Sequence, residues 1–87
     1  MNLSNGNNEI EFGGPATYRI VVKGALEQHW SDRLAGLAIT TTQQPGESPH
    51  TALVGLLRDQ AQLNGVLETL YDLHLPIIRV EEIGSEA

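Results

Sequence analysis

The stretch from Asp59 to Val80 constrains the fold more than any other part of this chain. Asp59 precedes Gln62 by three residues, a spacing typical of a capping box at the start of a helix. Pro76 forces the residue before it out of helical geometry, so the helix ends there and a β-branched run begins. The stretch therefore predicts an amphipathic helix followed by a strand over residues 77–83. The apolar face of this helix repeats at helical spacing and comprises Leu63, Val66, Leu67, Leu70 and Tyr71.

Residues 17–23 are rich in β-branched side chains and predict the first strand. Side chains alternate between the two faces of a strand, so one face is expected to be buried and the other open. The expected buried face carries Tyr18, Ile20 and Val22, and the opposite face carries Arg19, Val21 and Lys23.

The middle of the chain predicts a short helix and two further strands. Residues 27–35 show helical spacing of apolar side chains, with Trp30 as the expected anchor and a glycine placed to end the helix. Residues 37–42 and 51–57 read as strands, and the Pro- and Gly-containing segment 43–49 is the loop between them.

This order of elements predicts an α+β domain with the ferredoxin-like, split βαβ plait. Two helices would cover one face of a four-stranded antiparallel sheet, with the first and third strands adjacent and, through right-handed crossovers, parallel. Gly65 lies inside the second helix, where it is unfavourable relative to Ala, so a close approach of helix to sheet is expected there. The domain would span residues 16–83, between a flexible tail over 1–15 and a fraying end over 84–87.

A sheet covered by helices on one side leaves its other face for solvent, a ligand or another chain. If Ile20, Val22, Ile78 and Val80 face the helices, the open face carries Arg19, Lys23, Arg79, Val21, Ile77 and Glu81. The three cations, Arg19, Lys23 and Arg79, are candidate ligand-binding residues for an anionic metabolite or RNA. The alternative is a solvated sheet in which Arg19 or Lys23 forms a cross-strand pair with Glu81.

Composition narrows the classes of function. The formal charge of −6 disfavours nucleic acid, because the protein would repel a phosphate backbone. The absence of cysteine excludes disulfides and thiolate metal sites, and the three histidines lack the spacing that converges ligands on a metal. No metal or cofactor is expected. No apolar run approaches the roughly 20 residues of a membrane span, so a soluble, cytoplasmic protein is expected.

One pattern in the chain resembles a family of short uncharacterised bacterial proteins. The resemblance covers residues 17–83 and includes the strand over residues 18–24. It implies a small stand-alone cytoplasmic domain with the plait fold, and it brings no activity with it. The residues that carry it in the second half are Asp59, Gln60, Ala61, Leu63, Gly65, Leu67, Leu70, Leu73, Leu75, Pro76 and Val80.

Two functional hypotheses follow. The first is a small non-enzymatic interaction or regulatory module that uses the open sheet face, with Val21 and Ile77 at the interface and a protein partner or a second copy as its target. The second is a site for a small anionic molecule, or a small plait-type enzyme. Catalysis is the less favoured of these, because no nucleophile motif or pair of carboxylates in one pocket is evident.

Overall fold

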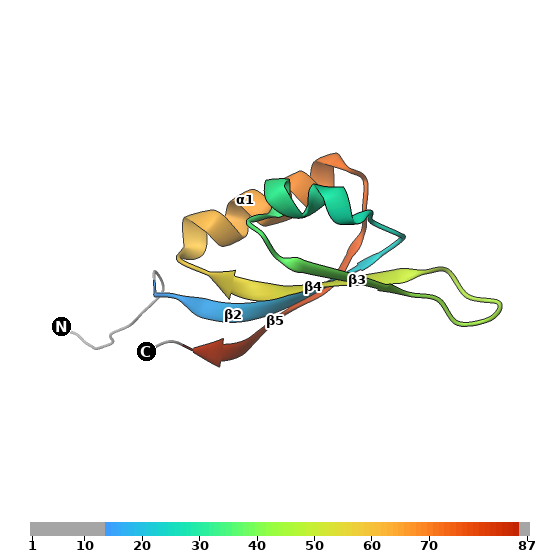
Figure 1. The fold of residues 1–87 in the computed structure, drawn as a ribbon, viewed down its shortest axis with the longest axis horizontal. Helices are drawn as coiled ribbons and strands as arrows, with labels where there is room; N and C mark the ends of the chain where they lie inside the picture. Colours follow the sequence, from blue (N-terminus) through green and yellow to red (C-terminus); the bar gives the residue numbers. More distant parts are fainter. Residues whose placement is uncertain (1–13, 86–87) are drawn as a thin grey trace.

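The computed structural model describes residues 14–85, so the predicted tail lies almost entirely outside the described residues. A four-stranded antiparallel sheet carries two helices on one side, which makes the domain α+β (Figure 1). The last strand continues through Ser85, two residues into the segment predicted to fray. In chain order, the elements are β2 (Ala16–Lys23), the 3-10 helix η1 (Gln28–Leu34), β3 (Ala38–Thr42), β4 (His50–Leu57), α1 (Gln60–Asp72) and β5 (Ile77–Ser85).

The strands lie in the order β3-β4-β2-β5, and all three neighbouring pairs are antiparallel. The first and third strands, β2 and β4, are adjacent as predicted, but the prediction that they are parallel is wrong. The reason is the hairpin. After the connection through η1, β3 runs in the same direction as β2. The β3–β4 hairpin then reverses the chain, so β4 is antiparallel to β2.

The helix-covered face of the sheet holds the core. Ile20 on β2 lies opposite Leu53 on β4, which lies opposite Ile39 on β3, and all three side chains are buried. Aliphatic side chains thus form a continuous band across three strands, as the low aromatic content requires. The buried cluster comprises Ile20, Val22, Leu26, Leu34, Leu37, Ile39, Leu53, Leu57, Val66 and Leu70.

The first helix is a 3-10 helix, where an α-helix was the expectation. Glu27 precedes it without a side-chain capping hydrogen bond, and a short uncapped segment readily adopts the tighter 3-10 geometry. Ala35 ends the helix in the left-handed region, with φ 59°. Leu34 is fully buried, whereas Trp30 is only half-buried and packs against the edge of the core. Leu34 is therefore the main anchor of η1, and Trp30, which was predicted in that role, packs against the core as a partly buried neighbour.

Hydrogen bonds at both ends fix α1. Asp59 caps the start as predicted, because its Oδ1 accepts from the backbone N–H of Gln62 at 2.9 Å. At the other end, the N–H of Leu75 donates to Leu70 O and the N–H of His74 donates to Tyr71 O. This is a Schellman motif with His74 at the left-handed position, φ 61°, where glycine is the usual residue.

Gly65 does not mark a close approach of helix to sheet, because a Cβ built there meets no atom within 4 Å. A close contact occurs instead at Gly55 on β4, where a Cβ would lie 2.8 Å from Cδ2 of Leu37, in the connection between η1 and β3. Position 55 faces the helix layer, and Leu37 fills the space that a side chain would need.

Gly65→Ala is expected to stabilise the domain. The added methyl group meets nothing, while Ala is favoured over Gly in a helix interior by about 1 kcal/mol. Urea unfolding followed by circular dichroism should show a higher midpoint at an unchanged slope. The matched variant Gly55→Ala should shift the midpoint the other way, because Leu37 is buried and has little room to move. Equal effects of the two variants would contradict this account.

Candidate functional site

The face of the sheet away from the helices combines apolar and cationic side chains. Arg19, Val21 and Lys23 on β2 point to this face, because the residues between them, Ile20 and Val22, are fully buried in the core. Directly opposite residues in an antiparallel pair share a face, so the neighbouring strands extend this surface in register. Their contributions opposite β2 are Val54, Ala52 and His50 from β4, and Glu81 and Arg79 from β5.

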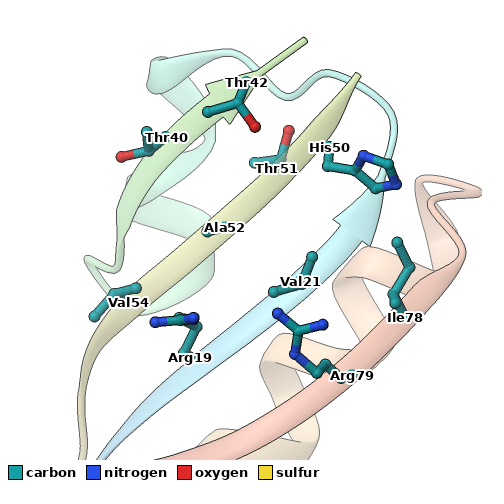
Figure 2. Close-up of a pocket in the computed structure, with 10 residues that line it drawn as sticks. All are labelled: Arg19, Val21, Thr40, Thr42, His50, Thr51, Ala52, Val54, Ile78 and Arg79. Carbon is teal, nitrogen blue, oxygen red and sulfur yellow. The ribbon is translucent and has the colours of Figure 1, made fainter. Parts of the chain in front are cut away.

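A hollow of about 490 Å³ lies on this open face (Figure 2). Val21, on the central strand β2, forms part of its floor and is only 9% exposed although no helix of residues 14–85 covers it. Arginine side chains border the floor on one side, and threonine and histidine side chains border it on the other. The lining residues are Arg19, Val21, Thr40, Thr42, His50, Thr51, Ala52, Val54, Ile78 and Arg79.

Two of the three predicted cations, Arg19 and Arg79, lie on neighbouring strands and share one carboxylate. Arg19 Nε is 3.4 Å from Glu81 Oε1, and Arg79 Nε is 3.3 Å from Glu81 Oε2. The cross-strand pair of Arg19 with Glu81, which was the alternative to a ligand site, is therefore present. These side chains are all partly exposed, so each pair contributes at most about 1 kcal/mol. Two guanidinium groups on one carboxylate leave this cluster with a positive charge.

Lys23 and Ile77 lie outside the lining of the hollow. Lys23 pairs with His50, and this pair lies beyond the Val21–Ala52 pair that belongs to the apolar floor of the hollow. The expected faces of Ile77 and Ile78 are exchanged, because the β2–β5 register shifts between Val21 and Val22. Ile77 pairs with the buried Val22 on the helix-covered side, and Ile78 lines the hollow (Figure 2).

Sequence reasoning expected part of the third strand, β4, on this face but named no residue of β3 or β4 there. Ala52 and Val54 alternate with the buried Thr51 and Leu53, and this alternation was the available signal. The sequence alone does not show which set of β4 side chains faces the helices, because both sets are fairly apolar. His50 belongs to β4 rather than to the preceding loop, which brings an imidazole to the end of the hollow.

Other polar groups of the described residues do not gather into a second charged site. No group of three or more His, Asp or Glu side chains in the described part of the chain could hold a metal ion. His29 lies 3.2 Å from the carboxylate of Glu27 and next to the Trp30 ring, on the exposed side of η1. A second hollow, of about 430 Å³, lies where α1 meets β5, next to Tyr71 and His74.

Membrane insertion through a helix finds no support in residues 14–85, where no helix is long and apolar enough to cross a bilayer.

Comparison with known protein families gives a match over most of the chain. A family model described as a domain of unknown function (DUF8691) matches residues 17–81, which include every residue that lines the hollow. No curated protein and no solved structure matches the chain. The matched family is uncharacterised, as the resemblance noted in the sequence implied, and it assigns no activity to the open face.

Proposed function

We propose that this chain, which belongs to the DUF8691 family, is a non-enzymatic interaction module that binds a partner on the open face of its sheet. The observation that carries the proposal is the hollow, whose apolar floor lies on the side of the sheet that no helix covers. Contiguous apolar surface rimmed by polar groups is characteristic of interaction sites. The partner is a protein segment that presents apolar and acidic side chains.

The distribution of charge over the molecule supports an acidic partner. The chain carries five Lys and Arg residues and a formal charge of −6, yet three of the five cations, Arg19, Lys23 and Arg79, lie on this face. Glu81 balances only part of their charge. An acidic segment is therefore attracted to this face and repelled by the rest of the molecule, which favours one orientation of binding.

The lining also supports binding rather than catalysis. Paired carboxylates or a nucleophile beside a base are the usual requirements for hydrolytic or acid–base chemistry. The described residues that line the hollow include no carboxylate, and its one histidine, His50, lies at the end of β4. Threonine hydroxyls at positions 40 and 42 offer hydrogen bonds that orient a partner's backbone.

A small anionic molecule is the second candidate for the same hollow. The volume of the hollow, about 490 Å³, falls within the range of small-molecule sites, roughly 300–1,000 Å³. Arg19 and Arg79 use Nε toward Glu81, and their planar terminal groups suit a carboxylate or phosphate.

We further infer that the fold is a variant of the ferredoxin-like plait in a cytoplasmic protein. The strand order β3-β4-β2-β5 and the position of both helices on one side of the sheet support this assignment. In this variant the 3-10 helix η1 takes the place of the first α-helix.

A peptide selection tests the proposal. A displayed library of random peptides is selected on the wild-type protein, with soluble Ala52→Lys protein present to remove peptides that bind elsewhere. Ala52 lies in the floor of the hollow, so a lysine there fills the hollow while keeping the face cationic. Enriched peptides are expected to combine acidic and apolar residues and to bind Ala52→Lys about tenfold or more weakly than wild type, as for a central contact residue.

Controls separate the two candidates. Glu68→Gln changes an exposed residue of α1 on the opposite side of the molecule, and it should leave peptide affinity unchanged. Succinate, citrate and inorganic phosphate are titrated against the same three proteins by thermal shift. Peptides that bind Ala52→Lys as tightly as wild type would rule out the hollow as their site. Stabilisation of wild type by the small anions, without peptide enrichment, would favour the second candidate.

A further inference from the structure

The outer edge of β5 is an unpaired strand edge in the described part of the chain. β5 is the last strand in the order β3-β4-β2-β5, and seven of its nine residues, all but Ile78 and Ile83, pair with β2. A long strand edge presents backbone N–H and C=O groups that another strand can bind. Such an edge is a docking surface unless the sequence protects it.

Apolar side chains concentrate on this edge. Four of the six large apolar residues that are exposed in the described residues lie on β5, namely Ile77, Ile78, Val80 and Ile83, with exposed fractions of 38–50%. No proline interrupts β5. The other edge strand, β3, is only five residues long and exposes chiefly threonine, so it offers much less apolar surface. The exposed apolar surface of the sheet edges therefore lies mainly at β5.

Antiparallel pairing of β5 with β5 of a second copy has few allowed registers. A two-fold axis perpendicular to the sheet keeps the helices of both copies on the same side, so each residue must pair with one from the same face. In the regular part of β5, Arg79 and Glu81 lie on the open face and Val80 lies on the helix-covered face, opposite Ile20. The axis therefore passes through a residue pair, at Arg79, Val80 or Glu81.

Charge selects one of these three registers. Centring on Arg79 would place two arginines opposite each other, and centring on Glu81 would place two glutamates opposite each other, both of which are destabilising. Centring on Val80 pairs Val80 with the partner's Val80, and it pairs Arg79 with the partner's Glu81 at two symmetric positions.

We propose that two copies of this chain pair through β5, in an antiparallel register centred on Val80, to form one continuous sheet. The backbone ladder and the apolar edge residues hold the two copies together, and the Arg79–Glu81 pairs set the register. The hollows of both copies stay open on the same face, so this dimer is independent of the proposed peptide site. Arg79 belongs to both surfaces, whereas Ala52→Lys changes the hollow and leaves β5 intact, so dimerisation can be measured apart from peptide binding.

Charge reversal tests the pairing directly. Light scattering over a micromolar to millimolar concentration series should show that wild type is a dimer. Arg79→Glu and Glu81→Arg each place like charges opposite each other at both positions, so each variant should dissociate about tenfold or more readily. An equimolar mixture of the two variants should recover the dimer, because each cross-strand pair then contains one acidic and one basic side chain.

Matched controls carry the same charge changes elsewhere. Arg58→Glu and Glu68→Arg alter exposed residues away from β5 and should dimerise like wild type. Circular dichroism melts confirm that all four variants are folded. A wild-type protein that stays monomeric throughout the series would overturn the proposal. So would single variants that dimerise like wild type, or a mixture that remains monomeric.

Discussion

Leu34→Ala is expected to lower the free energy of unfolding by about 2–5 kcal/mol, the range for truncation of a fully buried leucine. Leu34 is completely buried and is the residue of η1 that belongs to the buried core cluster. A domain of this size has a small total stability, roughly 5–15 kcal/mol at most, so the loss would be a large share of it. Urea unfolding followed by circular dichroism measures the change.

Asp32→Ala is the matched control for this prediction. Asp32 belongs to the same 3-10 helix and is exposed, so its truncation should change the free energy of unfolding by no more than about 0.5 kcal/mol. Similar midpoints for the two variants would mean that η1 does not anchor the fold. Trp30 fluorescence gives a second probe, because the indole lies in η1 and packs against the core edge.

The placement of the candidate site was partly predictable because side chains on a strand alternate. Arg19 and Val21 could be assigned to one face from the pattern of β2 alone, and the structure places both on the open face. The contact of Arg19 with Glu81 also follows from simple cross-strand pairing. Local spacing was sufficient here because β2 is regular along most of its length.

The exchange of Ile77 and Ile78 could not be predicted from local spacing. The register of β2 with β5 shifts between Val21 and Val22, and such an irregularity moves the side chains beyond it to the other face. Both positions are isoleucine, so composition gives no signal for the shift. The position of the irregularity depends on how the connection after α1 enters the sheet, which is a tertiary property.

The start of α1 was predicted well, whereas its end at Asp72 and the interior contact were not. Asp59 caps the helix through a neighbouring residue, so the sequence contains all the information. The role expected of Gly65 requires knowledge of what lies across from the helix, and the tight contact is made instead by Gly55 with Leu37. The type of helix at η1 depends in the same way on its surroundings, because a short segment without a cap has little intrinsic preference.

Three hydrogen bonds hold Lys23 and Gly24, at the end of β2 and immediately after it. The N–H of Gly24 donates to Pro49 O at 2.8 Å, and its carbonyl accepts from Thr51 Oγ1 at 2.6 Å. The neighbouring N–H of Lys23 donates to Pro76 O at 2.9 Å. The end of β2 is thereby tied to the start of β4 and to the segment before β5, which fixes the backbone that leads into η1.

Gly24→Ala is accordingly expected to lower the free energy of unfolding by about 3 kcal/mol or more. The backbone at Gly24 has φ +119°, a conformation that costs an L-residue about 1–3 kcal/mol. A Cβ there would also lie 2.9 Å from Leu75 Cδ2, and overpacking of this kind adds about 1–3 kcal/mol. The hydrogen bonds on both sides of the residue oppose relaxation.

Gly46→Ala separates the cost of backbone strain from the cost of the contact with Leu75. Gly46 also has a positive φ, +79°, but a Cβ there meets nothing within 4 Å and the residue lies in the exposed hairpin loop. Its replacement should therefore cost only backbone strain, about 1 kcal/mol. Thermal and urea unfolding of both variants should place Gly24→Ala well below Gly46→Ala. Equal destabilisation would show that contact with Leu75 is unimportant and that Gly24 serves the turn alone.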